Sequence, residues 1–148
     1  MRIVVINGPN LNMLGQREPE QYGTVTLEEI CRRLSERATG LGHTISFFQS
    51  NHEGDLVDFI QKAHQNCELL LINGAAYSHT SIALRDALAI LDCVKIEVHL
   101  SNVHARDPFR QISMTAAVCD GFIAGLGADS YYLALEGGLR LAMLRQDG

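Results

Sequence analysis

Residues 3–10 read IVVINGPN, a run of four β-branched residues that stops at turn-forming asparagine, glycine and proline. A strand without polar alternation is typical of a parallel sheet that is buried on both faces. A similar apolar run follows at residues 69–72, strand-like segments lie at 44–49 and 94–100, and a short one lies at 121–124. The sequence therefore predicts five parallel strands.

Helical patterns separate these strands at residues 26–40, 56–63 and 81–91, and a last one runs from 128 to about 144. The first begins at a capping box formed by Thr26 and Glu29. The alternation predicts an α/β fold, a doubly wound five-stranded parallel sheet with helices on both faces. The 148 residues suit a single domain, 1–148. Gly137-Gly138 predicts a bend or early fraying in the last helix, because each glycine costs about 1 kcal/mol relative to alanine.

Composition excludes several classes of partner. The chain has 12 lysines and arginines against 17 aspartates and glutamates, a net charge of −5, so neither nucleic acid nor an anionic membrane surface is an expected partner. No apolar window approaches about 18 residues and no signal-peptide pattern is present, which predicts a cytoplasmic protein. The four cysteines lack zinc-site spacing, and no His-Glu-x-x-His motif occurs, so we expect no metal.

The strand at 94–100 carries the clearest chemical signal. Glu97 and His99 project to one face of this strand, and both are costly to bury without a partner. We expect them to pair, with the carboxylate orienting a histidine that transfers protons. The pattern predicts an enzyme.

Polar loops follow the strands at the edge where parallel sheets bind ligands. The loop at 7–25 is too long for an ordinary connection and carries Asn10, Arg17 and Tyr22, so we expect a lid. The loop at 73–80 leads into a helix, and the loop at 100–113 adds arginines. Together they predict an anion pocket with acid–base chemistry.

Several motifs resemble one family, the type II 3-dehydroquinate dehydratases. They are NGPNLN at 7–12, REP at 17–19, YG at 22–23, QSNHEG at 49–54, HTS at 79–81, EVHLSNVHAR at 97–106 and GLG at 125–127. The resemblance implies a flavodoxin-like fold and a homo-oligomer, a dodecamer built from trimers. It also implies a hydro-lyase without cofactor or metal. Such an enzyme converts the small anionic substrate 3-dehydroquinate to 3-dehydroshikimate by anti elimination of water through an enolate, in the shikimate or quinate pathway.

The resemblance implies roles for individual residues as well. Tyr22 is the implied base at C2, and Arg17 stabilises its anion. His99 is the implied acid for the C1 hydroxyl, with Glu97 holding its ring, while Asn73 stabilises the enolate through a water. The remaining implied residues support or bind the substrate: Asn10, His79, Asp86, the backbone of Leu100 and Ser101, Arg106 and Arg110.

Other interpretations of the same residues stay open. Taken alone, Tyr22 also fits an ordinary surface aromatic, His79 a helix cap and Asp86 a surface charge. The family usually has Pro-Gly where this chain has Gly74-Ala75, so Ala75 is strained if the position requires a positive φ. The whole chain could also be a catalytically silent binding module, or a hydro-lyase or isomerase acting on another polyhydroxy acid.

Overall fold

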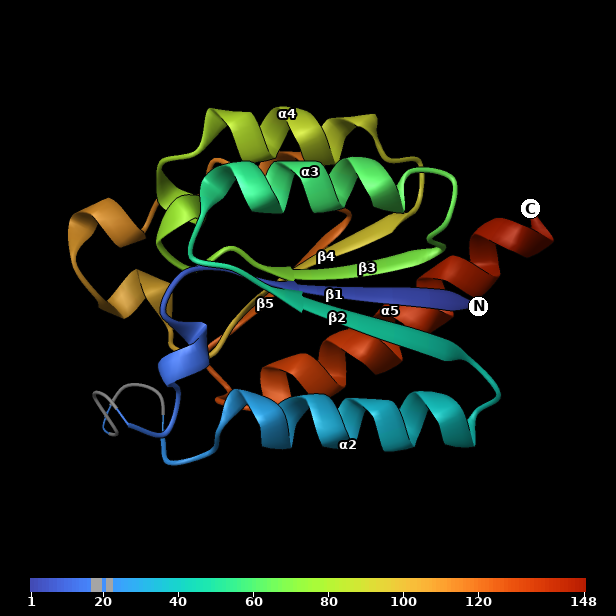
Figure 1. The fold of residues 1–148 in the computed structure, drawn as a ribbon, viewed down its shortest axis with the longest axis horizontal. Helices are drawn as coiled ribbons and strands as arrows, with labels where there is room; N and C mark the ends of the chain where they lie inside the picture. The colour runs from blue at the N-terminus through green and yellow to red at the C-terminus, as the bar shows by residue number, and fades with distance from the viewer. Residues whose placement is uncertain (17–19, 21–22) are drawn as a thin grey trace.

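The computed structural model describes residues 1–16, 20 and 23–148 of the chain. The described strands form one parallel sheet in the order β2-β1-β3-β4-β5 (Figure 1). They are β1 (Arg2–Asn7), β2 (Thr44–Gln49), β3 (Leu69–Asn73), β4 (Val94–His99) and β5 (Gly121–Ala124). The helices are α2 (Leu27–Gly40), α3 (Glu53–Ala63), α4 (Ile82–Ile90) and α5 (Asp129–Asp147). The predicted doubly wound, flavodoxin-like α/β fold is confirmed.

The sheet separates two apolar layers. Helices α3 and α4 cover one face, and α2 and α5 cover the other (Figure 1). Strand β1 contributes side chains to both layers, because successive side chains of a strand point to opposite faces. Ile3 and Val5 pack on the α2 and α5 side, while Val4 and Ile6 pack on the α3 and α4 side. Both faces are buried, as the unbroken apolar run predicts.

The start of α2 agrees with the prediction from the sequence, whereas the end of α5 does not. The Thr26 hydroxyl accepts a hydrogen bond from the Glu29 backbone N–H at 3.1 Å, so the predicted cap of α2 is confirmed. Of the bend or early fraying predicted at the paired glycines, the fraying is wrong, since α5 continues to Asp147, and the bend stays a prediction. A Cβ at Gly138 would lie 2.6 Å from Leu69 Cδ1, so this glycine allows α5 to approach β3 closely.

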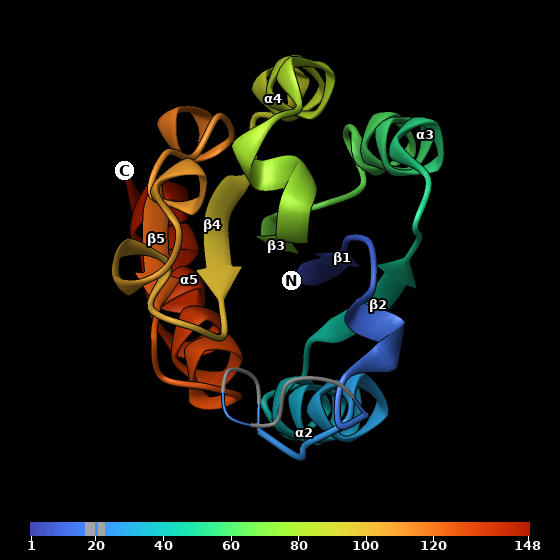
Figure 2. The same cartoon turned by 90° about the vertical axis from the view of Figure 1, so that its left-hand side faces the viewer.

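Short 3-10 turns gather beyond the carboxyl ends of the strands (Figure 2). They are η1 (Leu11–Met13), η2 (Ala75–His79), η3 (Val103–Ala105) and η4 (Pro108–Arg110), and η5 (Ala116–Val118) precedes β5. These turns follow β1, β3 and β4 and carry most of the polar loop residues singled out in the sequence. In the part of the chain that the structure describes, no helix is long and apolar enough to span a membrane.

Candidate active site

The Glu97–His99 pair lies at the carboxyl end of β4. Ile96 and Val98 pack toward α2 and α5, so the two polar side chains lie on the opposite face of the strand. His99 Nε2 is 2.9 Å from Glu97 Oε2, and the two residues are 5% and 0% exposed. An ionised carboxylate only accepts hydrogen bonds, so Nε2 carries the hydrogen and Nδ1 is the ring nitrogen left for other partners.

Two hydroxyls also bind Glu97. Ser113 Oγ donates to Oε2 at 2.6 Å, and Thr115 Oγ1 donates to Oε1. Burial alone would raise the pKa of this carboxyl, but hydrogen bonds from His99, Ser113 and Thr115 outweigh it and hold the pKa below its usual 4.5. Glu97 is therefore a buried carboxylate at neutral pH. Sequence reasoning missed both hydroxyl residues, because nothing in their loop distinguishes them from surface serine and threonine.

His79 is a second histidine near the pair, and its hydrogen lies on the other ring nitrogen. Its Nδ1 lies 2.8 Å from the carbonyl oxygen of Ile112, which fixes the hydrogen on Nδ1. The His79 and His99 rings lie 6.0 Å apart between centroids and are nearly parallel. Partial burial lowers the pKa of His79; the hydrogen bond to Ile112 opposes this, and the Arg110 guanidinium adds to the lowering. His79 is consequently neutral near pH 7, with Nε2 available as an acceptor.

Asn73 ends β3 and is almost fully buried. Its Oδ1 accepts a hydrogen bond from the Ala75 backbone N–H at 3.0 Å, and its Nδ2 donates to the Tyr131 hydroxyl at 3.0 Å. Ala75 has a φ of 51°, so the predicted positive φ at this position is present in an alanine. The turn after β3 thus combines a fixed amide with a strained backbone.

The loop after β1 is anchored at Asn10. This residue has a φ of 68°, and its backbone N–H donates to Asn51 Oδ1 at 2.9 Å. Gln49 Nε2 donates to the same Oδ1 at 3.2 Å and to the carbonyl of Gly8 at 3.2 Å. The QSN motif at the end of β2 therefore holds the start of the first loop. Arg17 and Tyr22, the predicted base and its partner, lie outside the described residues.

Two arginines come from the segment after β4. Arg106 Nη1 donates to Ser101 Oγ at 3.3 Å. Arg110 Nε is buried without a hydrogen bond to any described residue, and its nearest carboxylate oxygen, on Asp107, is 3.7 Å away. A guanidinium whose buried N–H lacks an acceptor favours an anionic ligand.

These side chains line one cavity at the carboxyl ends of β1, β3 and β4. The lining residues are Pro9, Asn10, Leu11, Leu14, Asn73, Ala75, Ala76, His79, His99, Leu100, Ser101, Val103, Arg106 and Arg110. The structure thus brings together eight of the twelve predicted site residues, and Glu97 lies behind His99. Asp86 is different: it lies on an exposed part of α4 and does not line this cavity.

The cavity can hold an anion and move protons. It contains a histidine on a carboxylate, a neutral histidine, an oriented amide and two arginines. Among residues 1–16, 20 and 23–148, no three histidine, cysteine, aspartate or glutamate side chains are grouped as a metal site requires. No lysine is among the described residues that line the cavity. Lys95 lies near the opposite end of β4, where its Nζ donates to the Leu91 carbonyl at 2.6 Å.

Comparisons with known proteins agree with this arrangement. The family model described as "Dehydroquinase class II" matches residues 1–139. The 3-dehydroquinate dehydratase of Leptothrix cholodnii is 48% identical over the full length of both chains, and that of Roseiflexus castenholzii is 56% identical over 92% of this chain and 87% of its own. The crystal structure of the type II dehydroquinase from Butyrivibrio crossotus superposes with a TM-score of 0.89 at 46% identity, covering 92% of this chain and 95% of that one.

Proposed function

The chain belongs to the class II dehydroquinase family and dehydrates 3-dehydroquinate to 3-dehydroshikimate, and we propose that it does so by acid–base chemistry in the cavity beyond β1, β3 and β4. The observation that carries the proposal is the buried Glu97–His99 pair at the wall of this cavity. The reaction is a step of the shikimate pathway, and quinate breakdown uses the same step.

His99 is the proposed general acid. Its Nε2–H is held by Glu97, so the proton to be transferred is the one on Nδ1. The imidazolium with both nitrogens protonated is stabilised by the adjacent carboxylate. It donates the Nδ1 proton to the C1 hydroxyl, which then leaves as water. The neutral ring that remains keeps its hydrogen bond to Glu97 and recovers a proton from solvent.

Tyr22 is the proposed base, and Arg17 is its proposed partner. Both assignments depend on the sequence motifs, because these residues lie outside the described part of the chain. A free phenol has a pKa near ~10, so it is a poor base at neutral pH. A unit positive charge at about 4 Å, with an effective dielectric near 20, contributes ~4 kcal/mol, or about three pKa units. One guanidinium is enough to bring a phenol into the working range.

The remaining groups bind the substrate and the enolate. The Asn73 amide has one N–H left after its contact with Tyr131, and this donor is suited to the enolate oxygen, directly or through a water. The guanidinium of Arg110 suits the substrate carboxylate. His79 Nε2 accepts a hydrogen bond from a substrate hydroxyl, because its Nδ1 hydrogen is used by Ile112.

Asp86 joins this site only if subunits assemble. Its exposed position on α4 keeps it out of the cavity of its own chain. We propose that the chain forms trimers, assembled into a dodecamer, and that Asp86 reaches the cavity of a neighbouring subunit. Light scattering tests the assembly. Mixing inactive Asp86→Asn and Tyr22→Phe proteins tests the shared site, since some mixed oligomers would contain one intact cavity and regain activity.

The reaction is tested by ultraviolet absorbance, which follows the conjugated enone of the product. We expect rising absorbance with the wild-type enzyme and a loss of kcat by orders of magnitude in Tyr22→Phe, which should still bind substrate. Binding without turnover in the wild type would favour a silent binding module. Turnover of a different polyhydroxy acid in a substrate panel would favour another hydro-lyase. Inactivation by borohydride in the presence of substrate would instead indicate an imine.

A further inference from the structure

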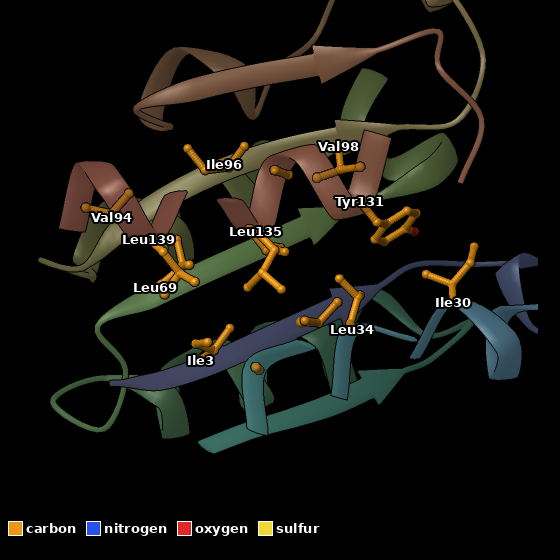
Figure 3. Close-up of a cluster of buried hydrophobic side chains, with 14 of the residues drawn as sticks. Ile3, Ile30, Leu34, Leu69, Val94, Ile96, Val98, Tyr131, Leu135 and Leu139 are labelled. Carbon is orange, nitrogen blue, oxygen red and sulfur yellow. The ribbon is translucent and has the colours of Figure 1, made fainter. Parts of the chain in front are cut away.

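A buried tyrosine lies directly behind the cavity without lining it. Tyr131, in α5, is 0% exposed, and it points toward the carboxyl end of the sheet (Figure 3). Strands β1 and β3 end there in register, at Asn7 and Asn73. Ile3 and Val5 of β1, like alternate residues of β3, pack on the face covered by α5, so both asparagine side chains lie on that same face.

The Tyr131 hydroxyl connects the two asparagines. It donates to Asn7 Oδ1 at 2.6 Å and accepts from Asn73 Nδ2 at 3.0 Å. A phenol has one hydrogen, and here it is used on Asn7, so only a lone pair remains for Asn73. The phenol therefore presents an acceptor, and nothing else, to the Asn73 amide.

This arrangement selects one of the two orientations of the Asn73 amide. In the orientation present, Oδ1 accepts from the Ala75 N–H and Nδ2 donates to Tyr131. After a 180° flip, Oδ1 would face the phenol oxygen and Nδ2 would face the Ala75 N–H, which loses two hydrogen bonds and opposes like groups. The amide is consequently held with its second N–H free for a ligand.

We infer that Tyr131 is a positioning residue for the reaction, which fixes the Asn73 amide as a hydrogen-bond donor to the enolate. The inference depends on the role proposed above for Asn73. Burial raises the pKa of Tyr131, because the ionised phenol would be desolvated, so the hydroxyl keeps its proton and its direction across the working pH range. An amide already aligned needs no reorganisation when the enolate forms.

The test is a kinetic comparison of Tyr131→Phe with the wild type. Phenylalanine keeps the buried ring and removes only the hydroxyl. We expect kcat to fall about tenfold while KM changes less than about threefold, since the lost contact acts mainly in the transition state. Tyr132→Phe is the matched control. It removes a hydroxyl from the next residue of α5, which is not part of the Asn7–Asn73 network, and should leave kcat unchanged.

A double-mutant cycle separates positioning from a general disturbance of the core. In an Asn73→Ala background, Tyr131→Phe should cause no further fall in kcat, because the amide it positions is gone. The same fall in both backgrounds would overturn the inference. If kcat is unchanged in Tyr131→Phe but reduced in Asn73→Ala, the inference about Tyr131 is overturned while the role of Asn73 stands. Full activity in Asn73→Ala would overturn the role of Asn73 itself.

A second variant covers the case in which Tyr131→Phe does not fold. Asn7→Ala removes the acceptor that directs the Tyr131 hydrogen and leaves the phenol in place. The freed hydroxyl then no longer presents only a lone pair to Asn73, so kcat should fall, and again not in the Asn73→Ala background. Additive effects of Asn7→Ala and Asn73→Ala would contradict the inference.

Discussion

Thr115→Val should remove one hydrogen bond from a buried carboxylate with almost no change in shape. The Thr115 hydroxyl donates to Glu97 Oε1, whereas Ser113 and His99 both bind Oε2. Among the described residues, Oε1 has no other donor. A hydrogen bond to a charged group contributes about 1.5–3 kcal/mol, so the free energy of unfolding at pH 7 should fall by about 2 kcal/mol.

The decrease in unfolding free energy caused by Thr115→Val should depend on pH, because the lost hydrogen bond stabilises the ionised form of Glu97. The pKa of this carboxyl is below its usual 4.5, so the ionised form stabilises the native state above pH 4.5, and this contribution is lost as the pH falls through the folded-state pKa. The difference between wild type and Thr115→Val should therefore be largest near neutral pH. It should shrink as the pH falls through the folded-state pKa of Glu97, because a protonated Glu97 requires fewer donors.

Urea unfolding at pH 7 and at the lowest pH where both proteins are folded measures this difference. Thr44→Val, which changes an exposed threonine of β2, is the matched control and should stay within about 0.5 kcal/mol of wild type at both values. An equal loss for Thr115→Val at both pH values would refute the reasoning. The kcat of Thr115→Val should also fall, because His99 is held by a less fixed carboxylate.

Four further substitutions should be informative. Gly137→Ala, at an exposed position of α5, should raise the free energy of unfolding by about 1 kcal/mol. Gly138→Ala should lower it by about 1–3 kcal/mol, because the added methyl group would contact Leu69. Urea unfolding that ranks the two variants the other way would contradict the close approach of α5 to β3. Ala75→Gly should stabilise by about 1 kcal/mol in the same assay, since glycine tolerates a φ of 51°, and a destabilised variant would argue against strain there. Arg110→Lys keeps the charge but loses the planar fork, so steady-state kinetics should give a KM raised about tenfold or more, and a KM within twofold of wild type would exclude carboxylate binding by Arg110.

The fold was predictable because its signals are local. Strands β1 and β3 are continuous apolar runs, as at Ile3–Ile6, and the segments before α2, α3 and α4 lead into helical periods, with a cap at Thr26. The loops at the carboxyl ends of the strands could be predicted to meet for the same reason, and these loops bring His79, His99 and Arg110 to one cavity.

The supporting contacts were not predictable, because they connect distant positions. Thr115 binds a carboxylate 18 residues away, and Tyr131 reaches asparagines 58 and 124 residues away. In the sequence Tyr131 is one apolar position of a helix. The fraying predicted at Gly137-Gly138 was wrong for a related reason, since the packing of Leu69 against Gly138 depends on tertiary structure.

The assignment of Tyr22 as base and His99 as acid is tested most directly by hydrogen exchange at C2 of 3-dehydroquinate in D₂O. The exchange is monitored by NMR and compared with an enzyme-free blank. Removing the acid should leave the base able to form the enolate, so His99→Ala should exchange a C2 hydrogen faster than it forms product. Tyr22→Phe should neither exchange nor dehydrate the substrate above the blank. Exchange by Tyr22→Phe at the rate of His99→Ala would contradict the proposed mechanism, because another group would then be the base.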